Sequence, residues 1–245
     1  IRIIQKEILS KDKNVLFLCA KASKSEPLFP SFYERIIIDL LKNFDKIEYQ
    51  IKNKVGNTTL DGWNKVFNES EDLANCFALI TQKTQDRLAK RWLTGGKLSN
   101  AHQATINVIL PIDDDDKKME ILKHLFKGLC EFFTSVVLAV DELEKVKTTK
   151  TAGILSDNLR EIYDDMPKKF GLICSFSGSK ASEWFSLGFT QALGGRLIHE
   201  APLEALTEDS IVEFMRIHQN LHRTSDNKQK EELYPFTAGG IKKIL

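Results

Sequence analysis

An uninterrupted apolar run near the middle of the chain ends directly in two acids. Residues 135–140 read Ser-Val-Val-Leu-Ala-Val, and Asp141 and Glu142 follow at once. A short run of β-branched and aliphatic residues is typical of a strand buried in a parallel sheet. Open parallel sheets bind their ligands at the carboxyl edge of the strands. The sequence therefore predicts an α/β fold in which this strand delivers two carboxylates to a ligand-binding edge.

Other short apolar runs alternate with stretches of helical periodicity, which is the pattern of a parallel α/β sheet. Residues 98–111 are predicted to connect two helices, and the long helical block at residues 61–133 is predicted to be an inserted layer. Further strands are predicted over residues 15–19, 170–178 and 196–200, with a minor strand as one interpretation of residues 47–51. Helices are predicted over residues 1–11, 32–43, 61–93, 117–133, 153–164 and 208–221, with Ser31 and Thr207 as N-caps.

Composition is that of an ordinary globular protein, with 42% hydrophobic and 28% charged residues. The 35 basic and 34 acidic residues nearly cancel, so the net charge gives no general reason to bind nucleic acid. No apolar run approaches the roughly 18 residues of a membrane span, and the charged amino-terminal stretch is not a signal peptide. The four cysteines include no C-x-x-C pair and are expected to be free thiols. These features predict a cytoplasmic protein with no membrane partner.

Adjacent acids at the end of a strand suit nucleotide hydrolysis. One carboxylate can hold Mg²⁺ while the second polarises the attacking water. Neighbouring residues on a strand point to opposite faces, so Asp141 could face the metal and Glu142 the water. An acidic loop after a core strand would have the same sequence, and spacing alone does not separate the two interpretations.

The order of the motifs resembles that of AAA+-type P-loop ATPases. Residues 135–142 resemble their Walker B strand, and the strand next to Walker B carries a polar residue called sensor 1, for which Ser177 is the candidate and Ser175 the alternative. Arg196 precedes an apolar strand, a Pro-Leu-x-x-Leu-Thr turn and a helix, as in the passage from the core to the lid of these proteins. The resemblance implies a three-layer P-loop NTPase-like core at residues 1–201 and the start of a truncated helical lid at residues 202–245.

The resemblance also implies roles for these residues. Asp141 would serve Mg²⁺, Glu142 would be the base that activates water, Ser175 or Ser177 would contact the nucleotide phosphate, and Arg196 could act as an arginine finger across a subunit interface. The implied cofactors are ATP and Mg²⁺, and the implied partners are further copies of the chain and a protein or DNA substrate. The Trp-Leu-Thr-Gly sequence at 92–95, followed by an aspartate-rich linker, looks most like prokaryotic ATP-binding proteins of phage-defence type, including BREX-associated ones. Origin-recognition-like and STAND ATPases are more distant relatives.

A phosphate loop of the form G-x-x-x-x-G-K-[ST] is absent from the 245 residues. Residues 1–10 and 15–19 look like the helix and strand that follow such a loop, so we expect it just before residue 1 and expect the chain to be a fragment. The sequence Gly-Gly-Lys at 95–97 follows a helix, lacks the leading glycine and does not fit the motif.

Three functions from different classes remain open on the sequence. The first is an ATPase core that couples hydrolysis to remodelling or switching, and the second is a non-catalytic interaction module of the same fold. The third is a metal-dependent nuclease that uses Asp141, Glu142 and the aspartate run at 113–116, although that run also suits a solvated helix cap. Lys145, Lys147 and Lys150 follow the acids and could reach a phosphate or DNA, with a solvated loop as the alternative. The pair His218 and His222 has a spacing that can bind Zn²⁺ but no obvious third ligand.

Overall fold

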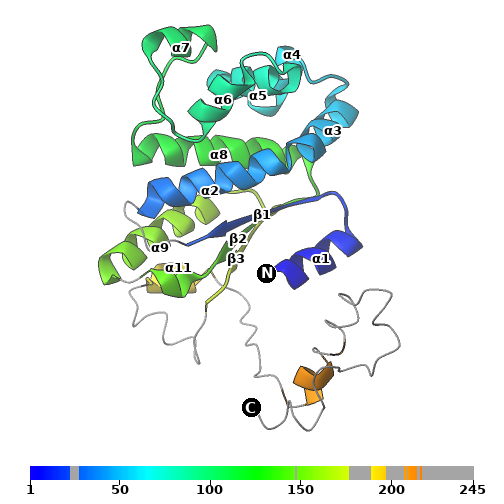
Figure 1. Ribbon diagram of the computed structural model, residues 1–245, viewed down its shortest axis with the longest axis vertical. Helices are drawn as coiled ribbons and strands as arrows, with labels where there is room; N and C mark the ends of the chain where they lie inside the picture. The colour runs from blue at the N-terminus through cyan, green and yellow to red at the C-terminus, as the bar shows by residue number, and fades with distance from the viewer. Residues whose placement is uncertain are drawn as a thin grey trace, which may run out of the picture. The chain divides into compact units, whose positions relative to one another are not determined.

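Three parallel strands form the sheet in the described part of the chain. The computed structural model describes residues 1–22, 28–146, 148–176, 189–196, 207, 209–213 and 216. The strands β1 (Val15–Lys21), β2 (Ser135–Asp141) and β3 (Phe170–Cys174) lie in the order β1-β2-β3, with β2 hydrogen-bonded on both sides (Figure 1). The predicted mixed α/β fold with a parallel sheet is confirmed at this level.

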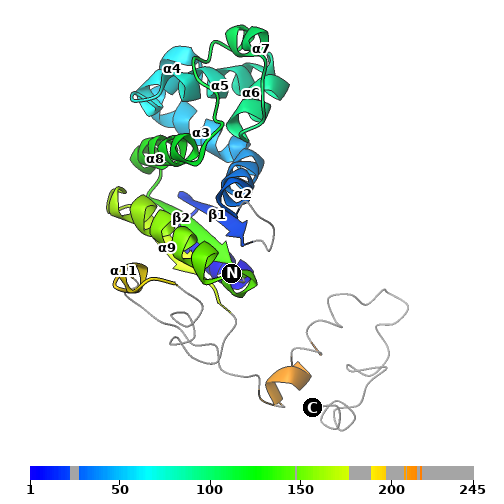
Figure 2. The ribbon, with the colours of Figure 1, turned by 90° about the vertical axis from the view of Figure 1, so that its left-hand side faces the viewer.

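Helices cover both faces of this sheet. Figures 1 and 2 show α1 on one face and α2, α8 and α9 on the other, with α3 to α7 stacked outside α2 and α8. The described helices are α1 (Arg2–Lys11), α2 (Leu28–Lys42), α3 (Phe44–Val55), α4 (Leu60–Val66), α5 (Glu71–Gln82), α6 (Asp86–Leu93), α7 (Asn100–Thr105), α8 (Asp115–Phe132), η1 (Leu143–Lys145, a 3₁₀ helix), α9 (Thr149–Asp164) and α11 (Gln191–Gly194).

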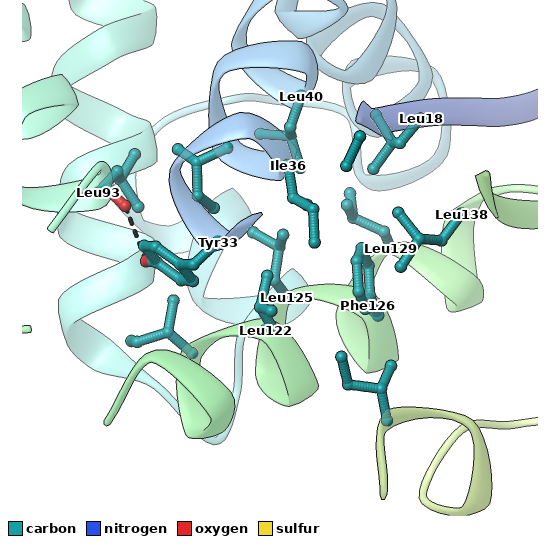
Figure 3. Packing of buried hydrophobic residues seen from close by; sticks show 14 of the residues in the cluster. Leu18, Tyr33, Ile36, Leu40, Leu93, Leu122, Leu125, Phe126, Leu129 and Leu138 are labelled. Atoms are coloured by element: carbon teal, nitrogen blue, oxygen red, sulfur yellow. Dashed lines mark hydrogen bonds between the residues drawn. The ribbon is translucent and has the colours of Figure 1, made fainter. Parts of the chain in front are cut away.

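Strand alternation divides the core into two clusters. Leu18 of β1 and Leu138 of β2 face α2 and α8 and are fully buried (Figure 3). Leu16 of β1 is also fully buried and belongs to the same cluster. Phe17 and Val137 face the other way and pack with the apolar residues of α1. Burying each such side chain stabilises the fold by about 1.5–3 kcal/mol. The larger cluster lies between the sheet and the helices α2, α8 and α9. Packing against these helices therefore stabilises the sheet more than packing against α1 does.

The outer helices α3 to α5 are held together by aromatic rings. Phe44, Trp63, Phe67 and Phe77 have ring centroids 4.8–6.1 Å apart. This group meets α8 where a Cβ on Gly128 would lie only 2.5 Å from the carbonyl oxygen of Val66. A glycine is therefore required for the close approach of the two segments.

Helix α8 lies within the 61–133 stretch that the sequence predicted to be an insertion, yet it packs directly on the sheet. The ring of Phe126 on α8 lies 5.2 Å from that of Phe170 on β3. Asp114 caps α8 by accepting a 2.7 Å hydrogen bond from the backbone N–H of Lys117. The aspartate run at 113–116 is thus the start of this helix, as its solvated-cap interpretation predicted.

Several local predictions are wrong in instructive ways. Residues 47–51 form part of α3 and not a minor strand, because Phe44, Ile47 and Ile51 fall on one buried helical face. Ser31 does not cap α2, which begins at Leu28 and includes it. The predicted connector at 98–111 contains the short helix α7, capped by the Ser99 hydroxyl. Burial therefore selects the helix at 47–51, whereas α7 buries no side chain and is marked by its Ser99 cap.

The outer edge of β1 is closed by side chains from α2 and α3. Asp39 Oδ2 accepts a 2.8 Å hydrogen bond from the N–H of Cys19, and Lys46 Nζ donates to the carbonyl oxygen of Val15 at 2.6 Å. Arg35 donates to the carbonyl oxygen of Lys21 at 2.7 Å. Exposed strand edges can pair with other chains, and side chains that bind the edge groups prevent this. In the part of the chain that the structure describes, the sheet therefore ends at β1.

The chain divides into two units, Ile1–Ile198 and His199–Leu245. In the second unit, Thr207 caps the helix that follows it, with its Oγ1 accepting a 3.2 Å hydrogen bond from the N–H of Ser210, as predicted. The predicted strand at 196–200 and most of the predicted lid at 202–245 lie outside the described residues. No helix among the described residues has the length and apolar character needed to cross a membrane.

We expect Asp39→Ala to destabilise the protein by about 1–3 kcal/mol, because the N–H of Cys19 loses its acceptor in a partly buried position. Asp39→Asn keeps an oxygen acceptor and should recover most of this loss. Urea denaturation followed by circular dichroism measures both variants. Equal losses in the two variants would show that the bond to Cys19 does not stabilise the sheet edge.

Candidate functional site

Three strand ends meet at the carboxyl edge of the sheet. Lys21 at the end of β1 pairs in register with Asp141 at the end of β2, and Val140 pairs with Cys174 at the end of β3. Ser175 follows β3 directly and continues the pairing, because its N–H donates to the carbonyl oxygen of Val140 at 2.8 Å. The structure therefore places Lys21, Asp141 and Ser175 side by side on neighbouring strands.

Glu142 leaves the strand instead of extending it. Its backbone has φ 61° and ψ 37°, a left-handed conformation that is costly for a residue with a side chain. The carboxylate of Asp141 stabilises this turn by accepting a 3.0 Å hydrogen bond from the N–H of Glu142. The two acids consequently do not occupy opposite faces of one strand, as the sequence suggested, because only Asp141 belongs to the strand.

Two lysines hold the carboxylate of Glu142. Lys21 Nζ lies 3.0 Å from Oε1, and Lys145 Nζ forms a short ion pair with Oε2. Hydrogen bonds and charge from Lys145 and Lys21 hold the pKa of Glu142 below its ordinary value, and Glu142 in turn raises the pKa of Lys21. Glu142 is thus an ionised acid whose two oxygens both have cationic partners.

Asp141 is the residue of this edge best placed to meet a metal ion. One carboxylate oxygen is engaged by the N–H of Glu142, and the side chain is half-buried at the strand end. Mg²⁺ is commonly held by one or two carboxylates together with water and substrate phosphate. A single carboxylate suits that mode better than an all-protein cage. Among the described residues, no group of three or more His, Cys, Asp or Glu side chains gathers into a cage.

Arg196 lies at the other end of the sheet from the acids. Its guanidinium makes a bidentate pair with Asp164, with Nε–Oδ1 and Nη2–Oδ2 distances of 2.8 and 2.7 Å. Asp164 ends α9, the helix that leads back to the start of β3, whereas Asp141 ends β2. The seven residues of β2 span roughly 20 Å. The structure therefore does not bring Arg196 to the acids of its own chain.

Other predicted candidates lie outside the described residues, namely Ser177, Lys147, His218 and His222. A hollow of about 140 Å³ belongs to the outer helices and not to the acid-bearing edge. Its lining residues come from α4, α5 and the end of α7, and include Leu60, Asn75, Leu79 and Ile106.

Sequence reasoning missed Lys21. Lys145 was singled out as a possible phosphate or DNA contact. In the structure its ammonium group binds the carboxylate of Glu142. A signal for Lys21 was present, because it ends the apolar run of β1 just as Asp141 ends that of β2. In a parallel sheet, polar residues at corresponding strand ends are brought to one edge.

Comparison of the chain with protein families, curated proteins and solved structures finds no match.

The backbone of Glu142 supplies a test of the local geometry. Glu142→Gly and Glu142→Val both remove the carboxylate, and only the valine side chain opposes a left-handed backbone. We expect the valine variant to unfold at a clearly lower urea concentration than the glycine variant, because a β-branched residue is strained at φ 61°. Equal unfolding midpoints would contradict the left-handed turn after Asp141.

Proposed function

We propose that the chain is the core of an AAA+-type ATPase, which couples ATP binding and hydrolysis to remodelling or switching of a partner. One observation carries the proposal. Asp141 ends the middle strand of a parallel sheet and Glu142 follows it, beside Ser175, which follows the neighbouring strand β3. Ligands of open α/β sheets bind at this edge. The strand order also supports the resemblance, since a strand with a polar residue at its end lies next to the acid-bearing strand.

In this proposal each residue has a distinct role. Asp141 serves Mg²⁺ directly or through water, and the ion would neutralise charge on the nucleotide phosphates. Glu142 would accept a proton from the attacking water. As it does so, the water oxygen bonds to the terminal phosphorus, and the bond from that phosphorus to the leaving nucleoside diphosphate breaks. Ser175, which follows β3 beside Asp141, would contact the terminal phosphate, a role for which Ser177 is also proposed. Arg196 would act on the site of a neighbouring copy.

Glu142 must be released before it can act as a base. Both of its oxygens are paired with lysines, and the resulting low pKa makes it a weak proton acceptor in this arrangement. Binding of a phosphate group near Lys21 and Lys145 would compete for those lysines. The proposal therefore includes a change in the side chain of Glu142 on nucleotide binding.

The absence of a phosphate loop from the 245 residues favours a second candidate, a non-catalytic interaction module of the same fold. Such a module would keep the sheet and helices for binding a protein partner and would not bind nucleotide. The nuclease alternative lacks comparable support, because the aspartates at 113–116 serve the start of α8.

Calorimetric titration with Mg-ATP separates the two candidates. It is applied to this chain and to a version extended in its gene by about 40 upstream residues, enough for a strand and a phosphate loop. We expect the extended version to bind Mg-ATP, and Asp141→Ala in that version to weaken binding by about tenfold or more through loss of the metal contact. Asp157→Ala, which removes an exposed acid on α9, is the matched control and should bind normally.

Hydrolysis is tested in the same extended version with Glu142→Gln. Removing the base should lower the rate of phosphate release by about 10²- to 10⁴-fold while Mg-ATP binding persists. Absence of binding by both lengths of chain would overturn the ATPase proposal and leave the interaction module.

A further inference from the structure

Helix α6 lies in a stretch of the chain that has basic residues and no acids. Residues 87–112 contain no Asp or Glu, but they contain four basic residues, namely Arg87, Lys90, Arg91 and Lys97. The chain as a whole has nearly equal numbers of basic and acidic residues. Positive charge is therefore concentrated on one part of an almost neutral protein.

Most of this charge is exposed and has no acidic partner. Lys90 lies 3.1 Å from Asp86, the last acid before the stretch, and the two charges compensate each other. The other cations form what we call the α6 cationic face. It consists of four exposed residues that make no ion pair in the part of the chain that the structure describes, namely Lys83, Arg87, Arg91 and Lys97.

The backbone brings these cations together. Arg87 and Arg91 are four residues apart on α6, so they lie on one side of the helix and about 6 Å apart along its axis. The N–H of Gly96 donates to the carbonyl oxygen of Arg91 at 2.8 Å, and a Cβ on Gly96 would lie only 2.7 Å from Cγ of Arg91. The chain thus turns back against Arg91, and Lys97 follows directly.

The opposite side of α6 is fixed to the core. Ala89, Trp92 and Leu93 are buried. Trp92 Nε1 donates to the carbonyl oxygen of Leu110 at 2.9 Å, and the hydroxyl of Tyr33 donates to the carbonyl oxygen of Leu93 at 2.7 Å (Figure 3). The cationic face is therefore carried by a rigid element and is formed before any ligand binds.

We propose that the α6 cationic face binds the phosphate backbone of a nucleic-acid duplex. Lysine and arginine side chains that neutralise backbone phosphates release condensed counterions, which drives binding that does not depend on base sequence. The face lies in the outer helical layer and not at the carboxyl edge of the sheet (Figures 1 and 2). The inference therefore goes beyond the proposed function and does not depend on it.

The residues around the face favour a duplex over a single strand. Proteins that hold single strands stack the bases on aromatic rings. Trp92 is the only Phe, Tyr or Trp in residues 83–112, and it is buried with its N–H engaged. The face offers contacts to phosphates and none to unstacked bases, so binding should show no sequence preference.

Acids limit the face at the carboxyl end of α6. Asp72 of α5 accepts a 3.1 Å hydrogen bond from the N–H of Ile109. The aspartate run at 113–116 begins just after Ile112, whose carbonyl oxygen lies 3.5 Å from the Cβ position of Gly95. These acids repel phosphates, so the centre of the proposed surface is the pair of arginines on α6.

Fluorescence anisotropy of a labelled short DNA duplex of mixed sequence, titrated with the full chain at several salt concentrations, tests the proposal. Four phosphate contacts predict that the logarithm of the association constant falls with the logarithm of salt concentration with a slope of about −3 to −4. We expect Arg87→Gln/Arg91→Gln to weaken binding at low salt by about tenfold or more and to reduce the steepness of that slope by about two.

Two further variants serve as controls. Lys11→Gln/Lys65→Gln removes the same net charge from exposed lysines that pair with Glu7 and Asp61, and it should bind as the wild type does. Arg87→Lys/Arg91→Lys keeps both charges on α6 and should bind within about threefold of the wild type, because lysine also binds phosphate as a point charge. Circular dichroism of each variant establishes that a loss of binding does not come from unfolding.

Several results would overturn the inference. They are no binding of the duplex at low salt, equal losses in the two glutamine double variants, and tighter binding of a labelled oligothymidine than of the duplex. Polyglutamate that displaced the labelled duplex as well as unlabelled duplex does, at matched charge, would show a surface for an acidic protein and overturn the assignment to nucleic acid. Loss of duplex binding in Arg87→Gln/Arg91→Gln alone would support the proposal whatever the outcome of the Mg-ATP titration.

Discussion

Hydrogen bonding on both sides of β2 is the constraint on which the acid-bearing edge depends. Parallel pairing in register brings the ends of three strands to one edge, so that residues more than 100 positions apart become neighbours. Adjacent strands lie about 4.8 Å apart, which is within reach of one side chain. The five central residues of β2 are buried, and the packing of α2, α8 and α9 maintains this alignment. The position of the site is therefore a consequence of the core.

Charge at this edge is balanced within the molecule. The left-handed turn at Glu142 directs its carboxylate to Lys21 and Lys145, while Asp141 stays at the strand end. An acid held by two cations has a lowered proton affinity, which is the opposite of what a general base needs. Under the ATPase proposal this arrangement connects ligand binding with catalysis, because the same lysines would serve the phosphates and restrain the base. Under the interaction-module alternative it is a stable surface ion network.

Prediction from sequence succeeded where burial follows a simple period. The strands at 15–19 and 135–140 and the helices at 1–11 and 117–133 all have a clear apolar run or stripe, and the structure contains each of them within a few residues. It failed at 47–51, where alternation and a helical face share the same apolar positions, and at Ser31, where the helix begins one turn earlier. Among the residues proposed for the site, Asp141, Glu142 and Ser175 lie at one edge of the sheet, whereas Arg196 binds Asp164 at the end of α9.

The sequence by itself determined the parallel α/β class, the strand that carries the acids and the edge at which they lie. These features follow from local patterns, because the spacing of apolar residues states which side chains must be buried. Only the tertiary structure decided that Lys21 and Lys145 hold Glu142, that Arg196 binds Asp164 and that Asp39 and Lys46 close the edge of β1. Such pairs join distant residues, and exposed polar partners leave no periodic signal. Their choice depends on strand register, helix placement and one left-handed residue, which are properties of the folded chain.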